Sequence, residues 1–357
     1  MVRIKIELKK EVIGGHMKDA KNNFFKGSIY TDLAVELHEM ISDDVRQDVE
    51  EECEIEGVRL EVKQTPKEDI KVTWVEILNE QGSKEMGKPI GNYVTVESQA
   101  MRENDVDTHE EIIKIVSENM AKLYKLDKES SILIVGLGNW NVTPDALGPK
   151  VISKVLVTRH ISESLPEAIS QNTRRVSAIS PGVMGITGIE TSEIVKGIVD
   201  RVKPDIVIAI DALASRSTSR INTTIQMSDT GVAPGAGMGN KRMVINQETM
   251  GVPVIAIGVP TVVDAATLIN DTMDSMLEDM ISYVEKGSEF YEMLKDLGAD
   301  NRYPVIKDIL DPYAGNMFVT PKEVDAVIER LSNIIANSIN ISVHPGITKE
   351  DINRYIY

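Results

Sequence analysis

Ser131-Ile-Leu-Ile-Val-Gly136 is the stretch that decides the fold, and it runs directly into Leu137-Gly-Asn139. Short continuous apolar runs of this kind are typical of parallel strands buried on both faces of a sheet. Two further runs, Ile206-Val-Ile-Ala-Ile210 and Val252-Pro-Val-Ile-Ala-Ile257, have the same character. Helical periodicity predicts helices around these runs and near the C-terminal end, over about 146–160, 188–203, 261–286 and 321–340. Alternating strands and helices predict an α/β fold, a doubly wound and mostly parallel sheet flanked by helices.

The region before these runs has the period of half-buried strands. Three segments alternate apolar and polar residues: Val58–Lys63, Lys71–Ile77 and Tyr93–Glu97. They predict an antiparallel β subregion inserted at about 55–100. An apolar stripe from Ile112 to Leu123 then predicts a helix, with Thr108 as its N-cap and Glu111 three residues later.

Charge is distributed unevenly along the chain. The 357 residues have a net charge of −17, whereas residues 1–32 hold seven Lys/Arg and four Asp/Glu, or +3, which leaves −17 − 3 = −20 for the rest. The predicted organisation is a weakly ordered leader or propeptide over 1–32 and one α/β domain over 33–357. The negative body disfavours nucleic-acid phosphates and acidic membranes as partners. Charges interrupt every apolar run well before the roughly 20 residues of a membrane span, and the single cysteine, Cys53, fits a reducing cytoplasm.

An acid follows the first buried strand. The segment Gly136-Leu-Gly138-Asn139 resembles the start of a dinucleotide fingerprint, but asparagine stands at position 141, where the third glycine belongs. Thr143 can cap the next helix and Pro144 suits its first position, which puts Asp145 in the first turn. Open α/β sheets bind ligands at the carboxyl ends of their strands. A helix-stabilising role for Asp145 is the competing interpretation.

A second acid, Asp211, follows five apolar residues of a strand that should be central. Burying a carboxylate there is costly unless it is paired or functional. An ion pair with Arg216 is the competing interpretation. If Asp145 and Asp211 face one crevice, one of them stays protonated. The pair then has the acid and base needed to activate water and protonate a leaving amine.

Other motifs give weaker signals. Asp229-Thr230-Gly231 matches the tripeptide of pepsin-like proteases, but those are all-β, so we interpret it as a turn. The glycine-rich segment 231–242 lacks the spacing of a phosphate-binding loop. It is expected to be a flexible active-site loop. A nucleotide- or phosphate-binding α/β module that uses the glycine-rich loops is the alternative function. The five histidines lie far apart and form no zinc-binding motif, so no metal and no cofactor are expected.

Several long stretches resemble the spore germination proteases, and the likeness covers nearly all of the chain from about residue 28. They are Tyr30-Thr-Asp-Leu-Ala-Val-Glu36, Ser131–Pro149, Ser180–Thr191 and Asp211–Arg216 with the glycine-rich segment that follows. The resemblance implies a homotetrameric endopeptidase, made as a self-processing zymogen, that initiates degradation of small acid-soluble, DNA-protecting spore proteins at germination. It implies a location in the cytoplasm of the forespore or spore core.

The resemblance also implies which residues act. The proposed catalytic pair of the family falls on Asp145 and Asp211, and Gly136, Gly138 and Asn139 are expected to shape the site. Hydrogenase-maturation endopeptidases are more distantly similar: they share the Gly-x-Gly-Asn strand end and two acids, with a histidine as third metal ligand. No histidine stands in the matching region after Asp211, so an atypical aspartic, metal-independent mechanism is expected.

The cleavage point of the leader is expected from substrate chemistry. Targets of the family resemble Thr-Glu-Ile/Phe-Ala-Ser-Glu and are cut after the first acid. Thr31-Asp32-Leu33-Ala34-Val35-Glu36 repeats this order of acid, large apolar residue, alanine and later glutamate. Self-cleavage is therefore predicted between Asp32 and Leu33. The competing interpretation is that Thr31 caps the first helix.

Overall fold

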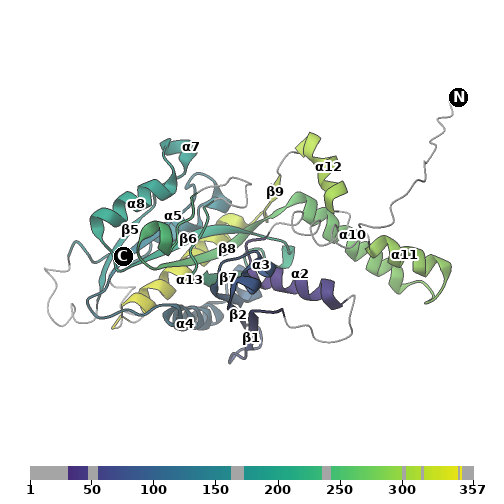
Figure 1. The fold of residues 1–357 in the computed structure, drawn as a ribbon, viewed down its shortest axis with the longest axis horizontal. Helices are drawn as coiled ribbons and strands as arrows, with labels where there is room; N and C mark the ends of the chain where they lie inside the picture. The colour runs from purple at the N-terminus through teal and green to yellow at the C-terminus, as the bar shows by residue number, and fades with distance from the viewer. Residues whose placement is uncertain are drawn as a thin grey trace.

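A nine-stranded mixed sheet forms the centre of the protein in a computed structural model (Figure 1). The structure describes residues 31–46, 55–161, 173–234, 243–299, 303–314, 317–344 and 346–347. Its strand order is β1-β2-β3-β7-β8-β6-β4-β5, with β9 paired to β8. The expected leader lies outside the described residues except for Thr31 and Asp32.

Three strands of the parallel half, β4, β6 and β8, are built from the predicted apolar runs, whereas the fourth, β5, was not predicted. β4 (Ser131–Gly136) lies between β5 (Arg175–Ile179) and β6 (Ile206–Ser215), and β6 also pairs with β8 (Val254–Asp264). These pairings are parallel. Buried strands of this kind need apolar side chains on both faces, which the runs supply. The predicted α/β fold with a parallel core is confirmed.

The antiparallel half is continuous with this core. β1 (Val58–Lys63), β2 (Lys71–Ile77) and β3 (Gly91–Glu97) form a meander, as predicted for 55–100. β3 pairs with β7 (Thr224–Ser228), which in turn pairs with β8, so the meander extends the same sheet. The two-residue β9 (Phe318–Val319) adds to the end of β8.

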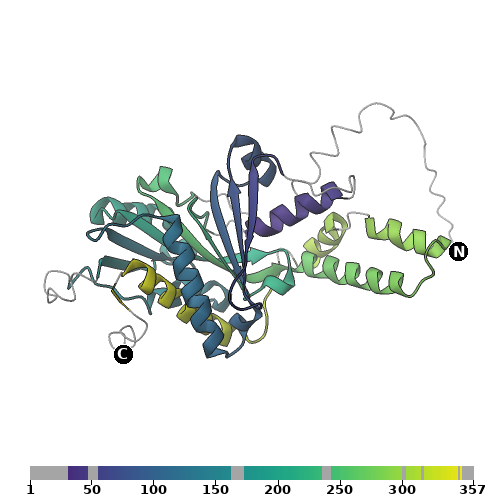
Figure 2. The same cartoon turned by 90° about the horizontal axis from the view of Figure 1, so that it is seen from below.

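Helices cover both faces of the sheet, as Figure 2 shows. On one face, α4 (Val106–Leu123), α5 (Leu147–Ile152) and α13 (Val324–Val343) share a buried core with alternate strand residues such as Ile134 and Ile208. On the other face, α8 (Thr191–Val202) and α9 (Gln247–Met250) pack on the intervening residues, among them Leu133, Val135 and Val207. The strand period of two therefore divides the apolar residues between two helical layers.

The remaining helices lie at the ends of the sheet. α2 (Ala34–Arg46) and α3 (Glu80–Met86) pack on the antiparallel half. Both views show a helical arm that projects beyond the sheet (Figures 1 and 2), formed by α10 (Ala265–Ser282), α11 (Glu289–Ala299) and α12 (Tyr303–Ala314). Short turns complete the described chain: η2 (Gln99–Arg102), η3 (Thr143–Asp145), α7 (Met184–Thr187) and η4 (Thr218–Arg220). Within the described ranges no helix is both long and apolar enough to span a membrane.

Two local predictions were wrong. The N-cap of α4 is Asp105, whose carboxylate accepts the Thr108 N–H at 3.1 Å. Thr108 itself lies in the first turn and donates its hydroxyl to the same carboxylate. The helix expected over 146–160 ends at Ile152, because the chain beyond it bonds elsewhere: the Leu156 N–H donates to Asn340 Oδ1 at 2.8 Å.

His344, the C-cap of α13, should make stability depend on pH. It is fully buried and accepts the Arg174 N–H through Nδ1 at 3.2 Å. Burial lowers its pKa from 6.5 to about 4, and the charge of Arg174 acts in the same direction. In the unfolded chain His344 is therefore protonated below about pH 6.5, whereas in the folded chain it stays neutral down to about pH 4. Stability is present above pH 6.5 and is lost as the pH falls, by up to about 3 kcal/mol.

We expect His344→Gln, which retains hydrogen-bonding groups and does not titrate, to show a flatter loss of unfolding free energy between pH 7 and pH 4. Urea unfolding of both proteins at several pH values measures the difference. Parallel curves for the two proteins would contradict the assignment.

Candidate active site at the ends of β4 and β6

Asp145 is held against the end of β4 by backbone contacts. The Asn139 N–H donates to Asp145 Oδ2 at 2.8 Å and to the Asp145 carbonyl at 3.0 Å. Gly138 has φ +113°, and a Cβ there would lie 2.0 Å from the Asp145 carbonyl oxygen. The turn therefore needs glycine at position 138. The expected site-shaping residues Gly138 and Asn139 thus contact the first acid.

Gly136, at the end of β4, likewise allows a close approach, here between β4 and α5. A Cβ at Gly136 would meet the carbonyl oxygen of Gly148 in α5 at 2.3 Å. The absence of a side chain lets α5 start directly above β4, which places η3 and Asp145 at the carboxyl end of the strand. Thr143 does not cap this turn, contrary to prediction, because its hydroxyl donates to Asp325 Oδ1 of α13 at 2.8 Å.

Asp211 stands where β6 passes the end of β4. The two strands pair in register as far as Gly136 and Ile210, and the Leu137 N–H donates to the Ile210 carbonyl at 2.8 Å. Asp211 is the next residue, is 6% exposed, and accepts the Ala212 N–H through Oδ1 at 2.9 Å.

Both acids therefore belong to one edge of the sheet. η3 contacts β6 and β8, and Asp145 is bonded to Asn139 of the segment that continues β4. The parallel pairing of β4 with β6 brings that segment to Asp211. This edge is the place where open α/β sheets bind ligands. A half-buried carboxyl and a buried carboxyl at that edge have the chemistry of an acid/base pair.

The predicted cleavage junction also lies on β6. The Asp32 N–H donates to the Ala214 carbonyl at 3.0 Å, and the Ala214 N–H donates to Asp32 Oδ2 at 2.9 Å. Gln226 of β7 brackets the following residue, since its Nε2 donates to the Asp32 carbonyl at 3.0 Å and its Oε1 accepts the Ala34 N–H at 2.7 Å. Leu33 and Ala34 are fully buried. Thr31 is not the residue before α2, which starts at Ala34, but its hydroxyl accepts the Leu33 N–H at 3.0 Å.

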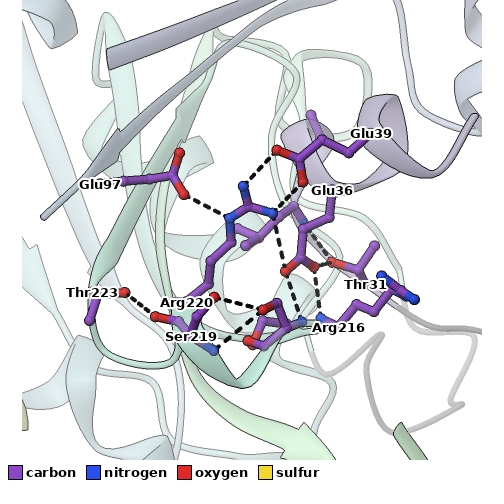
Figure 3. A network of polar contacts seen from close by, with 12 residues as sticks. Thr31, Glu36, Glu39, Glu97, Arg216, Ser219, Arg220 and Thr223 are labelled. Atoms are coloured by element: carbon purple, nitrogen blue, oxygen red, sulfur yellow. Dashed lines mark hydrogen bonds and ion pairs between the residues drawn. The ribbon is translucent and has the colours of Figure 1, made fainter. Parts of the chain in front are cut away.

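A network of charges continues from this junction (Figure 3). Glu36 of α2 is 2% exposed and accepts the N–H groups of Arg216 and Ser217 at 2.7 and 2.9 Å. It also accepts the hydroxyl of Thr31 and lies 3.6 Å from the Arg220 guanidinium. Four donors thus converge on one buried carboxylate.

Arg220 joins this carboxylate to two others. It donates two bonds to Glu39, at 2.6 and 2.7 Å, and one to Glu97 at 2.7 Å. Burial works against its charge, but the hydrogen bonds that it donates to Glu39 and Glu97 raise the pKa of the Arg220 guanidinium above its ordinary value. Burial also raises the pKa of Asp271, which lies near Arg216 and Glu36. Sequence reasoning missed Arg220 and Gln226, whose partners lie more than 120 positions away.

Metal ligands do not gather in the described part of the chain. No group of three or more His, Cys, Asp and Glu side chains there is arranged to hold a metal ion. Three histidines have other contacts: His38 with Ser42, His109 with the Ala100 carbonyl, and His344 with Arg174.

The Asp229 tripeptide is structural. As predicted, it turns, and Asp229 accepts the N–H and side-chain amide of Asn92 at 2.8 and 2.7 Å. The residues before it form the buried strand β7. Most of the expected glycine-rich loop, residues 235–242, lies outside the described residues.

Comparison with known proteins adds the family. A family model described as germination protease matches residues 34–288 and 276–356. The chain belongs to the germination protease family. Germination proteases of Clostridium perfringens and Clostridium tetani are each 51% identical to it over 329 residues, which cover 92% of this chain and 99% of theirs. That of Bacillus cereus is 44% identical over 366 residues, which cover 93% and 98%.

Membership in the germination protease family makes the chain an endopeptidase of spore germination. Among solved structures, a NiFe hydrogenase maturation protease from Thermococcus kodakarensis matches 62% of this chain and 98% of its own, at 17% identity and a TM-score of 0.31.

Gly138→Ala should disable the endopeptidase without unfolding it. The added Cβ must displace the Asp145 backbone, and misplacing a reacting group by about 1 Å can cost about 100-fold in rate. Peptide cleavage and thermal unfolding measure the two effects. Gly197→Ala is the matched control, because a Cβ there meets nothing within 4 Å. Equal activity of the two variants would contradict the placement of Asp145 in the site.

Proposed function

We propose that this chain is a self-processing zymogen that cuts small acid-soluble spore proteins with Asp145 and Asp211 as its catalytic pair. The observation that carries the proposal is the parallel register of β4 and β6, which puts the two acids at one sheet edge. Family membership supplies the endopeptidase activity. Homotetrameric assembly and a location in the forespore or spore core belong to the same proposal.

The two carboxyl groups take different roles. Both accept a backbone N–H, but Asp145 is half-buried whereas Asp211 is only 6% exposed, and burial disfavours the charged form of a carboxyl group. Asp145 is therefore the partner that carries the charge. It acts as the base that removes a proton from a water molecule. The resulting hydroxide attacks the scissile carbonyl carbon, and Asp211, in its protonated form, gives its proton to the amine as the carbon–nitrogen bond breaks. The amine leaves with that proton. After the turnover Asp145 is protonated and Asp211 is ionised, so the two carboxyl groups have exchanged protonation states.

These roles need no bound metal ion, because Asp145 and Asp211 carry out both proton transfers. The pair resembles other shared carboxyl sites, where two acids close together do not both ionise. Metal-independent catalysis is therefore part of the proposal.

Self-processing is supported by the position of the junction. Asp32 is bonded to Ala214, three residues beyond Asp211 on the same strand. Three strand residues span about 10 Å, so the Asp32–Leu33 bond is close to the site but displaced along β6. Cleavage requires the segment to shift by that distance toward Asp211.

Asp145→Asn and Asp211→Asn should each lower the rate of peptide cleavage by about 1,000-fold or more, since each removes half of the proton-transfer pair. Chromatography of peptide fragments measures the rate, and thermal unfolding checks the fold. Asp229→Asn is the control, because that carboxylate also accepts a backbone N–H yet lies in the structural turn. Cleavage at the normal rate by either catalytic variant would sink the assignment.

The matured protein should begin at Leu33. N-terminal sequencing of the protein after processing checks this, and the Asp145→Asn precursor should stay uncut under the same conditions. Another first residue refutes the site. Processing of the Asp145→Asn precursor at the normal rate refutes self-cleavage and points to a second protease.

A further inference from the structure

We propose that the pocket around Glu36 is a subsite for the substrate, one that reads an acid four residues after the cleaved bond. The pocket is formed by the N–H groups of Arg216 and Ser217 and by the Arg220 guanidinium (Figure 3). Its ligand is an acidic peptide in extended conformation. The inference rests on the proposed function and adds to it the residues that select the sequence after the cut.

The pocket has the features of a carboxylate receptor. Two adjacent N–H groups, 2.7 and 2.9 Å from the two oxygens of Glu36, fix the carboxylate geometrically. The Arg220 side chain is only 13% exposed, so its charge acts in a poorly hydrated place. Arg216 also has a buried Nε without a hydrogen-bond partner among the described residues. Charge-assisted bonds of this kind are stronger and shorter than neutral ones.

The pocket lies at the correct distance from the acids for an extended peptide. Asp211 and Arg216 are five strand positions apart, or about 17 Å. From a cleaved bond to the fourth residue after it, an extended peptide covers about 13 Å, and a glutamate side chain reaches further. The chain's own segment runs in the same direction as β6, since Asp32 contacts Ala214 and Glu36 contacts Arg216. A substrate bound in this way places its bond at Asp211 and its acid in the pocket.

In the zymogen the same pocket holds the chain's own Asp32–Leu33 junction away from Asp145 and Asp211. α2 starts at Ala34, so the step from Leu33 to Glu36 is helical. Three helical residues advance about 4.5 Å, whereas three extended residues advance about 10 Å. With Glu36 fixed in the pocket, the helical turn draws the Asp32–Leu33 bond toward Ala214. Unwinding that turn moves the bond about 5 Å back toward Asp211, which is about half of the shift that cleavage requires.

Cleavage then empties the pocket for substrate. It creates a charged amine on Leu33, which is fully buried, and the matching carboxylate on Asp32 leaves with the leader. A buried ammonium group without its partner is strongly unfavourable. The start of α2 is therefore released from the pocket, and the next acidic peptide can take the place of Glu36.

The direct test uses two peptides that share the sequence around the cut and differ only in Glu or Gln at the fourth residue after it. Matured wild-type protein should cut the Gln peptide with a kcat/KM at least about 10-fold lower than that for the Glu peptide. This is the loss expected for a charge-assisted bond. Arg220→Gln should cut both peptides at rates within about 3-fold of each other. Arg220→Lys should recover part of the discrimination, because it restores the charge.

Glu97→Gln is the matched control, because Glu97 contacts Arg220 from outside the pocket, and it should retain the wild-type preference. Equal cleavage of both peptides by wild-type protein overturns the subsite, whatever the variants do. Failure of matured wild-type protein to cut either peptide overturns the proposed function itself, and the subsite with it.

A pair of precursors tests the held junction. Val35 is 2% exposed in the first turn of α2. Val35→Ala and Val35→Gly both remove the buried methyl groups, but glycine weakens the helix, so the Gly precursor should process itself about 4-fold faster than the Ala precursor. Equal or slower processing of the Gly precursor overturns the role of the helical turn.

Discussion

The pairing of β6 with its neighbours is the interaction on which the rest of the structure depends. β6 is central, with β4 on one side and β8 on the other. Its apolar residues divide between the two helical layers, which fixes its register. A slip of one residue would turn Asp211 to the other face of the sheet. The register that builds the core therefore also positions Asp211, one of the two proposed catalytic acids.

β6 extends well beyond the end of its neighbour β4. β4 ends at Gly136, opposite Ile210, whereas β6 continues to Ser215. The extra residues bind the junction through Ala214 and bind Glu36 just after the strand ends. One strand thus aligns Asp211, the predicted Asp32–Leu33 junction and the N–H groups that bind Glu36 along a single direction. In our proposal, regulation and substrate selection therefore use the same surface.

The sequence was informative where one physical demand dominated. Continuous apolar runs predicted the parallel strands, and the acids at their ends were recognised because a buried strand rarely ends in a carboxylate without a reason. The sequence was uninformative where polar residues are buried because they form hydrogen bonds or ion pairs with residues distant in the chain. β7, Thr224–Ser228, contains threonine, glutamine and serine, yet all five residues are buried, because Gln226 binds the junction backbone. Arg220 has no local pattern, since its partner Glu39 is 181 positions away.

A crystal structure of matured Asp211→Asn with an uncut acidic peptide tests the central claim most directly. The account predicts an extended peptide that runs parallel to β6, with its scissile carbonyl beside Asp145 and position 211. Its glutamate should accept the N–H groups of Arg216 and Ser217 and contact Arg220. A peptide bound on another face of the sheet, or one whose scissile bond lies away from both acids, would contradict the account.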